Sequence, residues 1–470
     1  MAKPGRPDEL QIVLLVALVQ FVNILDFMMV MPLGPYFADA LGFAKSHVGF
    51  IGMAYTAAAG VSGLAGAFFL DRFDRRRALL VAMFGLSIAT ALGGLAVDLP
   101  TLLAARVLAG LFGGPATSVA LAIVADIVPP ERRGRALGTV MTAFSVASVL
   151  GVPIGLSLAD FGGWRMPFFG VALLGLAALA FAYLRLPSLR IHLDEARGPA
   201  RSRLEGLSAL LANPIVLLSF GLTALAMTGG FILIPTIAAY LDANLAYPKA
   251  MLKLLYFAGG LVTIFTIRQV GKLVDRLGSF VVGTLGTVML CTVTWISFVW
   301  YSRADADAIV GALRGGPLDF LVHVGGASLP LGAVLPMMLL FVGFMFSSSF
   351  RNVAYNTLTT KVPRPQERAA FMSVQSAVQH FASAGGAFLS SILLTDAADG
   401  TLTGMPTVAY SSIALASCVP VALFVVERAV TRRARLGALA AASPEAGAPP
   451  STTSTRDASR GPGVADLEQG

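Results

Sequence analysis

The chain of 470 residues is 56% hydrophobic and only 13% charged, and its mean hydropathy is +0.77. A water-soluble fold of this size has no interior large enough for so much apolar surface, so the composition indicates a membrane protein and excludes a soluble enzyme or binding domain. The net charge of +8 would suit nucleic acid, but the basic residues lie in loops between apolar segments and form no basic domain. We therefore expect the lipid bilayer, and not nucleic acid, as a partner.

Twelve apolar stretches are long enough for a helix to cross roughly 30 Å of hydrocarbon. They lie at residues 10–33, 47–70, 78–97, 101–125, 136–158, 166–186, 215–241, 252–273, 280–300, 331–357, 370–394 and 406–427. We expect the first to be retained, because it lacks a small-residue cleavage site and is longer than the core of a signal peptide. The two cysteines, Cys291 and Cys418, fall inside spans, where we expect both to be buried as small hydrophobic side chains.

Lysine and arginine are divided unevenly between alternate loops. Most of the 34 lie on the side that includes residues 72–77, 132–135, 361–368 and the C-terminal tail. Because positive charge is retained on the cytoplasmic side of a membrane, we expect both termini to be cytoplasmic. On the other side, residues 302–328 mix apolar and acidic side chains and can form a short surface helix.

A polar stretch divides the spans into two sets of six. Residues 187–213, which contain RIHLDEARGPARSR, are predicted to be a cytoplasmic linker between a first bundle, residues 1–186, and a second, residues 214–430. Residues 431–470 are poor in large apolar side chains, so we predict a disordered cytoplasmic tail.

A short charged phrase occurs after the second span of each set. The first copy, FFLDRFDRRR, contains Asp71 and Arg72, and the second, GKLVDRLGS, contains Asp275 and Arg276. Another pair of phrases, IVPPERRGRALGTVMTA and KVPRPQERAAFMSVQSA, follows the fourth span of each set. Such parallel repeats predict two homologous bundles related by an axis along the membrane normal, with solute bound between them near the middle of the membrane.

Twelve spans in two sets of six, with an Asp-Arg phrase after spans two and eight, resemble the major facilitator superfamily. The resemblance implies an all-α membrane protein with 12 transmembrane helices arranged as two pseudo-symmetric six-helix bundles. It also implies a secondary transporter and not an enzyme, with no cofactor, and a monomer in the bacterial inner membrane. The implied partners are a small-molecule substrate and protons.

In that family the phrase follows the pattern G-x-L-A-D-R-x-G-R-[KR] and contributes to a cytoplasmic gate. A carboxylate there can meet helix N-termini and arginines of the other bundle while the protein is open outward. Anchoring of the topology is the alternative explanation for the basic run after Asp74. The predicted gate residues are Asp71, Arg72, Arg75 and Arg76 in the first copy and Gly271, Asp275 and Arg276 in the second. Each copy departs from the pattern, at Ala67 and Asp74 in the first and at Ser279 and Phe280 in the second.

Span five carries VLGVPIG, with Gly151, Pro153 and Gly155. It is similar to the Gly-Pro phrase of exporters, with one valine inserted, and together with the following GGWRMPFF it most resembles the twelve-span drug:proton antiporters and arabinose-efflux-like permeases. The glycines and the proline permit close helix contact and a bend. Helix packing alone also explains these residues.

Asp26 is the only acidic residue well inside a span, and Asn23 shares a broad face of the same helix. In span four, Arg106 begins an R-x-x-x-G pattern seen in proton-driven members of the family. Asp26 lies about 16 residues into its span and Arg106 about five from the opposite surface, so their depths agree. Because a charge facing lipid is costly, we predict that both face the cavity, with Asp26 as proton carrier and Arg106 as its modulator. A static salt bridge is the alternative.

The predicted substrate-binding residues contribute polar or charged groups inside the spans. They are Asn23, Asp26, Tyr55, Arg106, Arg351 and Tyr355. Interhelical hydrogen bonding is an alternative role for Arg351, and aromatic side chains such as Phe27 and Phe231 can form an apolar pocket. No cluster with metal-ligand spacing and no phosphate loop is present in the sequence, so no metal site is predicted. One acidic residue against several intramembrane arginines disfavours multivalent cations and leaves neutral, zwitterionic or anionic solutes open.

Two functions fit these residues. A proton-coupled exporter of drugs or small metabolites, working by alternating access, is favoured by the phrase in span five and by Asp26. A proton-coupled importer of sugars or metabolites has the same fold. Accumulation of solute in everted or in right-side-out vesicles distinguishes the two.

The first Asp-Arg copy carries more basic residues than the second, so we expect an asymmetric gate. Asp71→Asn should impair transport more than Asp275→Asn, because more charge contacts depend on the first carboxylate. Solute uptake by vesicles that contain each variant measures the difference. The reverse order of impairment would contradict the predicted asymmetry.

Overall fold

The computed structural model describes residues 9–189, 208, 210–313, 316, 321–324, 327–364 and 367–442. The chain divides into two compact units, Met1–Glu427 and Arg428–Gly470. All of the contacts discussed below lie within the first unit. Most of the predicted linker and the last part of the predicted tail fall outside the described residues, so their boundaries stay predictions.

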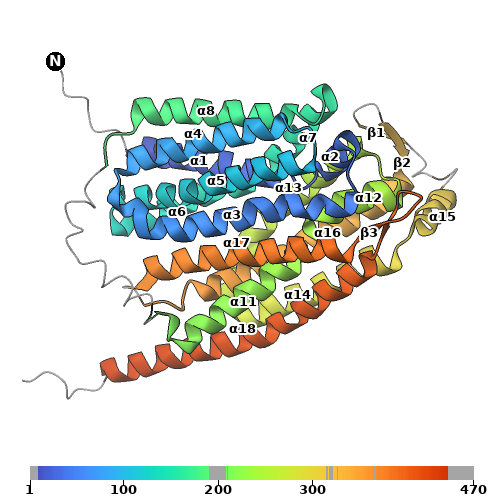
Figure 1. Ribbon diagram of the computed structural model, residues 1–470. Helices are drawn as coiled ribbons and strands as arrows, with labels where there is room; N and C mark the ends of the chain where they lie inside the picture. Colours follow the sequence, from blue (N-terminus) through green and yellow to red (C-terminus); the bar gives the residue numbers. More distant parts are fainter. Residues whose placement is uncertain are drawn as a thin grey trace, which may run out of the picture. The chain divides into compact units, whose positions relative to one another are not determined.

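The described part of the first half is helical (Figure 1). Its α-helices are α1 (Glu9–Met28), α2 (Gly34–Leu41), α3 (Val48–Phe69), α4 (Arg75–Gly94), α5 (Leu99–Ile127), α6 (Pro130–Val146), α7 (Val152–Gly162) and α8 (Met166–Arg185). Short turns of 3-10 helix, η1 (Lys45–His47) and η2 (Leu70–Arg72), flank α3, and one π-helical turn, η3 (Ala147–Gly151), joins α6 to α7.

The second half also consists mainly of long helices. They are α11 (Pro214–Phe231), α12 (Ile237–Leu245), α13 (Lys249–Leu277), α14 (Ser279–Trp295), α15 (Arg303–Leu313), α16 (Leu331–Thr359), α17 (Arg368–Leu393) and α18 (Met405–Ala442), with the short turns η4 (Ile234–Thr236) and η5 (Ile296–Trp300). Two antiparallel pairs of strands lie between helices: β1 (Leu321–Val324) with β2 (Ala327–Pro330), and β3 (Thr395–Asp396) with β4 (Leu402–Thr403). The short surface helix predicted in the loop before α16 is confirmed as α15, which has no buried residue.

Ten helical segments among the described residues are long and apolar enough to cross a membrane. The fifth predicted span is instead divided by η3 into α6 and α7, because Pro153 cannot donate the next backbone hydrogen bond of an unbroken helix. The eleventh, α17, has sufficient length but too many polar side chains. One of them, Gln375, is buried and donates to Thr223 of α11 (2.9 Å), so this polarity faces protein.

The two halves meet along two pairs of helices. α3, the second span, packs against α17, the eleventh, and α13, the eighth span, packs against η3 and α7 of the fifth. Exchanging the halves converts one pair into the other, as a parallel repeat requires. Glycines permit both approaches: a Cβ on Gly49 would lie 2.4 Å from the carbonyl oxygen of Ala387, and one on Gly260 would lie 2.9 Å from Cα of Val149.

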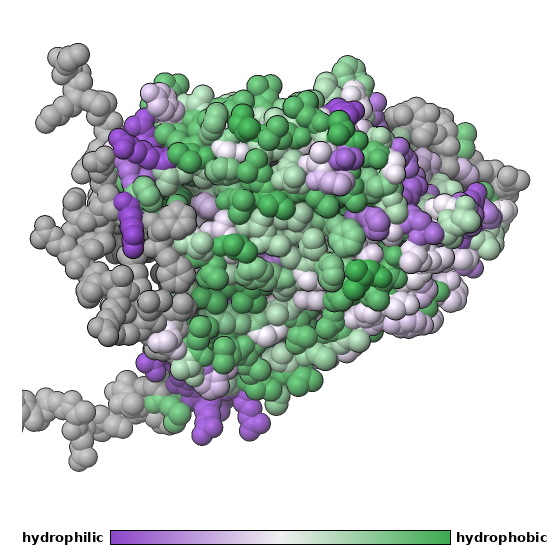
Figure 2. Space-filling view, viewed as in Figure 1, coloured by the Kyte–Doolittle hydropathy of each residue, from purple (hydrophilic) through white to green (hydrophobic). Residues whose placement is uncertain are grey.

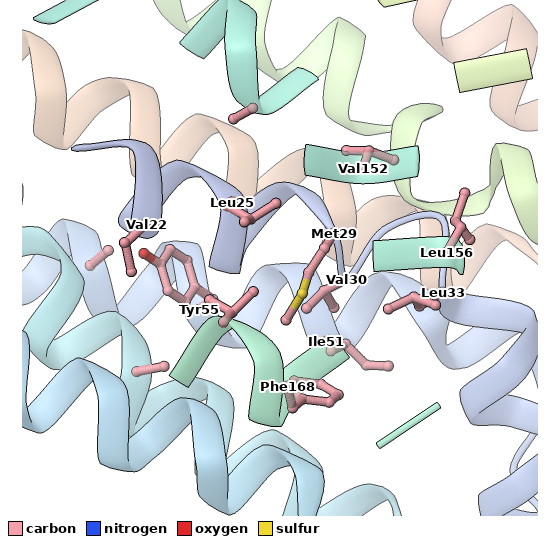
Figure 3. Close-up of a cluster of buried hydrophobic side chains, with 14 of the residues drawn as sticks. Val22, Leu25, Met29, Val30, Leu33, Ile51, Tyr55, Val152, Leu156 and Phe168 are labelled. Carbon is pink, nitrogen blue, oxygen red and sulfur yellow. The ribbon is translucent and has the colours of Figure 1, made fainter. Parts of the chain in front are cut away.

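The surface and the core are both apolar. Figure 2 shows hydrophobic residues over the middle of the helices and hydrophilic residues toward their ends, the pattern of a protein surrounded by lipid. Figure 3 shows part of the core, where Leu25 of α1, Tyr55 of α3, Val152 of α7 and Phe168 of α8 are all buried. The prediction that both cysteines are buried is wrong: Cys291 on α14 is only partly buried, and Cys418 is exposed on α18, where a thiol among apolar neighbours is compatible with lipid.

In each half, a carboxylate accepts hydrogen bonds from backbone N–H groups at the start of the third long helix. Asp74 caps α4 and accepts from the backbone N–H of Arg76 (2.9 Å), while its side chain also holds Ser188 and the N–H of Leu189 after α8. In the second half, Glu427 of α18 accepts from the N–H groups of Ser279 (2.7 Å) and Phe280 (3.0 Å) at the start of α14. These contacts give a structural role to Asp74, one of the departures of the first Asp-Arg copy from the family pattern.

Removing the carboxylate of Glu427 should destabilise the protein. In Glu427→Ala the first N–H groups of α14 lose their acceptor, and the loss of such a cap lowers the free energy of unfolding by about 1 kcal/mol. The midpoint of thermal unfolding in detergent measures the effect. Asp307→Ala, on the exposed surface of α15, is the matched control. Equal midpoints for the two variants would show that the cap contributes nothing.

Candidate functional site

Asp26 and Arg106 form an ion pair inside the first half. Asp26 lies near the end of α1 and is 0% exposed, and Arg106 lies in the second turn of α5 and is 1% exposed. Nη1 of Arg106 donates to Oδ1 of Asp26 (3.0 Å), and Nη2 donates to the backbone oxygen of the same residue (3.3 Å). At this burial each charge depends on the other for compensation.

Only one oxygen of the Asp26 carboxylate is engaged. Oδ1 also accepts from Oγ1 of Thr90 on α4 (2.7 Å). Among the described residues no donor reaches Oδ2, and Nε of Arg106 has no acceptor. The pair is therefore held through a single oxygen, and the second oxygen can take a proton without displacing a protein hydrogen bond.

Tyr55 and Asn23 complete the network. The Tyr55 hydroxyl donates to Oδ1 of Asn23 (2.6 Å), and the guanidinium of Arg106 lies over the Tyr55 ring, 4.6 Å from its centroid. Asn23 in turn donates to the backbone oxygen of Gly113 on α5 (2.9 Å). A Cβ on Gly113 would lie 2.4 Å from the Tyr55 hydroxyl, so the glycine provides the space that brings α3 and α5 together here.

An aromatic contact leads from this network to the second half. Phe27, next to Asp26 on α1, stacks on Tyr55 with ring centroids 5.3 Å apart. On its other side Phe27 stacks on Phe231 at the end of α11, at 5.9 Å. The two halves therefore touch through aromatic rings one residue away from the buried carboxylate.

The remaining predicted substrate-binding residues, Arg351 and Tyr355, lie on α16 in the second half, and both are buried. No hydrogen bond or ion pair between described residues joins them directly to the Asp26 network. Nε and Nη1 of Arg351 have no hydrogen-bond partner among the described residues. The structure thus forms one group from Asn23, Asp26, Tyr55 and Arg106 and leaves Arg351 and Tyr355 apart from it.

The phrase of span five lies where three helices meet. Gly151 ends η3, and a Cβ there would lie 2.5 Å from Cδ1 of Leu25 on α1. Pro153 begins α7, and Gly155 faces Met29, which follows α1. The phrase therefore positions the helix that carries Asp26, while η3 itself packs on α13 of the other half.

The predicted gate residues lie at the end of the molecule where α3 passes into η2 and α13 ends, which we call the Asp-Arg end. The side chain of Asp71 is outside the described part of the structure, and Arg72 is exposed. Arg75 pairs with Asp126 of α5 (3.2 Å), and Arg76 donates to the backbone oxygen of Tyr183 on α8 (2.6 Å). These contacts remain within the first half.

The second Asp-Arg copy is open to its surroundings. Asp275 and Arg276 are exposed, and within the described residues neither side chain makes an ion pair or a hydrogen bond. Gly271 has no heavy atom within 4 Å of where its Cβ would be, and Arg276 lines a cavity of about 590 Å³ between α13 and α16. The side chains of the second copy therefore have room to form new contacts at this end of the molecule.

Charged side chains join the halves at the opposite end, where α2, α12 and the strands lie (Figure 1). Lys45 of the first half pairs with Asp242 (2.7 Å), Lys249 pairs with Asp39 of α2, and Lys253 pairs with Asp160 (2.9 Å). Each half thus supplies both lysines and aspartates. We call these three pairs the charged clasp.

Two further carboxylate contacts support the charged clasp. The carboxylate of Asp396, on β3, accepts from the backbone N–H groups of Lys45 (2.9 Å) and Ser46 (3.1 Å). Tyr36 donates to Asp160 (2.7 Å), and burial together with this hydrogen bond raises the pKa of the Tyr36 hydroxyl above its ordinary value. The hydroxyl therefore stays protonated and remains a donor.

Sequence analysis missed several partners of the predicted residues: Thr90, Asp126, Glu427 and the charged clasp. Thr90 is a β-branched residue in an apolar span, and nothing in its neighbourhood of the sequence distinguishes it. All of the clasp residues except Lys253 fall between the predicted spans, where charge is ordinary. A signal was present only for Glu427, as an acidic residue at the end of an otherwise apolar span.

A bundle of apolar helices in two related halves, with a buried ion pair beside their junction, is the architecture of a membrane transporter. The chain belongs to the Major Facilitator Superfamily, because residues 16–387 match the profile of that family. The resemblance and the fold class expected from the sequence are thereby confirmed. The protein is a multi-pass membrane transporter for small molecules, and not an enzyme.

Curated relatives include proteins named for drug resistance. The chain is 31% identical over 289 residues to a chloramphenicol resistance protein of Streptomyces lividans, covering 61% of this chain and 72% of that protein. It is 27% identical over 248 residues to a chloramphenicol efflux pump of Mycobacterium tuberculosis, covering 51% of this chain and 57% of that protein, which is less than two thirds of its length.

A solved structure supports the fold. A bacterial homologue of the human lysosomal transporter Spinster, in an inward-facing and unoccupied conformation, aligns with a TM-score of 0.65 at 15% identity. The alignment covers 91% of this chain and 99% of that one. At this identity the likeness shows the shared fold alone.

Removing one charge of the buried Asp26–Arg106 pair should lower the free energy of unfolding more than removing both charges. Arg106→Met leaves Asp26 buried without compensation, and such a loss costs about 3–5 kcal/mol. The double variant Asp26→Asn with Arg106→Met should recover most of that loss, because no charge remains. Thermal unfolding in detergent of the wild type, both single variants and the double variant measures the coupling. Losses that simply add would show that the two charges do not depend on each other.

Proposed function

We propose that the chain is a proton-coupled exporter of drugs or other small organic solutes. The observation that carries the proposal is the buried Asp26 carboxylate, whose Oδ2 is free of protein donors while Arg106 holds Oδ1. The names of the two curated relatives, one for drug resistance and one for efflux, support the direction and the class of solute.

The proton step follows from the geometry of the pair. A proton on Oδ2 neutralises Asp26 and weakens its attraction for Arg106. The guanidinium of Arg106 remains charged. It can then move away from Asp26 across the face of the Tyr55 ring, over which it already lies. Because Tyr55 stacks on Phe27, and Phe27 on Phe231, this shift reaches the junction of the halves.

Alternating access would use the two ends of the molecule in turn. In the orientation expected from the basic loops, the charged clasp lies on the outer side and the Asp-Arg end on the cytoplasmic side. The clasp is formed while Asp275 and Arg276 are exposed, which supports a conformation closed to the outside. In the opposite conformation the clasp would part, and Asp71, Arg72, Asp275 and Arg276 would contribute to closing the cytoplasmic end.

The solute would bind between the halves, beside Phe27 and Phe231. In this proposal Asn23, Asp26, Tyr55 and Arg106 would contribute to binding from the first half, and Arg351 and Tyr355 from the second. We further propose that the protein works as a monomer in a bacterial inner membrane with both termini cytoplasmic. We also propose that residues 1–186 and 214–430 form the two bundles, as the sequence predicts.

Asp26→Asn should abolish proton-coupled transport, because an amide can neither carry the proton nor compensate Arg106. Everted vesicles energised with a proton gradient are tested with a panel of neutral, zwitterionic and anionic organic compounds that includes chloramphenicol. We expect wild-type vesicles to accumulate at least one of these compounds and the variant to reach only the level of vesicles without the protein.

Asp399→Asn, in an exposed loop, is the control and should transport as the wild type does. Full proton-coupled accumulation by Asp26→Asn would refute the role of the carboxylate. Accumulation by right-side-out vesicles alone would refute export and favour the importer that the same fold allows.

A further inference from the structure

Arg351 is a buried charge that no carboxylate among the described residues compensates. Its side chain is 3% exposed, and its Nε and Nη1 have no acceptor among the described residues. An arginine remains protonated at any physiological pH, so the positive charge cannot be relieved by loss of a proton. Arg106, at similar burial, has Asp26.

The six long helices of the second half offer no free carboxylate to Arg351. In α11, α13, α14, α16, α17 and α18 the only acidic residues are Asp275 and Glu427. Asp275 is exposed near the end of α13, and Glu427 is engaged by the first turn of α14. A charge buried without a partner is costly and is retained where function requires it.

The guanidinium lies beside the junction of the two halves. A Cβ on Gly230 of α11 would lie 3.4 Å from Nη2 of Arg351, so the absence of a side chain there leaves space next to the charge. The following residue, Phe231, stacks on Phe27 of the first half. The unpaired charge is thus adjacent to the place where parallel repeats put their solute.

We propose that Arg351 binds an acidic group of the transported solute, with a carboxylate as the representative case, so that the exported solutes are organic anions or zwitterions. This inference rests on the proposed export function and names the class of its substrate. A carboxylate can accept two parallel hydrogen bonds from a guanidinium, one from Nη2 and one from either Nε or Nη1, which would satisfy one of the two unpaired nitrogens together with the charge. The rings of Phe27 and Phe231 would then contact the apolar body of the solute.

The first test compares solutes that differ only in charge. Benzoate with benzamide and 2-naphthoate with 2-naphthamide are matched in size and shape. Purified protein is titrated with each, and apparent affinity is obtained from thermal stabilisation. We expect the wild type to bind carboxylates more tightly than amides and Arg351→Gln to lose that preference by about tenfold or more. Arg351→Lys, which retains the charge but not the fork of donors, should be intermediate.

Arg303→Gln is the control, because it removes an exposed arginine of α15 and should retain the wild-type preference. Equal binding of carboxylates and amides by the wild type would overturn the inference. So would a preference that persists in Arg351→Gln, or stabilisation by chloride alone that equals stabilisation by the carboxylates. None of these outcomes bears on Asp26→Asn, so the proposed export can stand while the class of substrate falls.

The second test needs no solute. Arg351→Met should raise the midpoint of thermal unfolding of the ligand-free protein by about 2 °C or more, because a costly charge is replaced by an apolar side chain of similar length. A structural role in hydrogen bonding between helices requires the opposite, a lower midpoint. A fall in the midpoint of Arg351→Met would therefore overturn the inference even if the solutes distinguish the variants.

Discussion

The cost of placing charge among apolar helices is the constraint on which the first half of this transporter depends. Asp26 is tolerated because three other helices direct groups towards it or its partner: Arg106 from α5, Thr90 from α4 and Tyr55 from α3. Small residues make this convergence possible, since a side chain at Gly113 would collide with the Tyr55 hydroxyl. The contacts that pack the first half are therefore the same contacts that hold the Asp26 carboxylate. A change in the protonation of Asp26 must affect every helix that contributes one of them.

The two halves share a fold but differ in how they compensate charge. In the first half an internal carboxylate neutralises Arg106, whereas in the described part of the second half Arg351 has no such partner. The difference also appears at the helix ends, where Asp74 caps its own helix and Glu427 reaches α14 from α18. A duplicated scaffold has in this way separated two tasks that we assign to proton and solute. The aromatic contact of Phe27 with Phe231 connects them.

Much of the fold could be predicted from the sequence, because hydropathy and repeated phrases are local signals. The depths of Asp26 and Arg106 within their spans were sufficient to suggest that they meet, because both helices cross the same membrane with the same rise per residue. The clasp could not be anticipated, because Lys45 and Asp242 lie in different halves and no pattern in either loop specifies the other. Cys418 was misplaced for a related reason: an apolar span has a lipid face and a protein face, and composition does not distinguish them. The roles of the gate residues, Asp71 above all, stay predictions.

The clasp is reciprocal, with Lys45 facing Asp242 in one direction and Lys249 and Lys253 facing Asp39 and Asp160 in the other. Separating surfaces of this kind exposes both signs of charge on each side, so neither half acquires a large net charge. A membrane potential would accordingly do little work on such a separation. Dissolved salt, in contrast, screens every pair at once. In the proposed orientation, the ease with which the clasp parts would thus depend on the ionic strength of the outer medium, and the electrical state of the membrane would have little part in it.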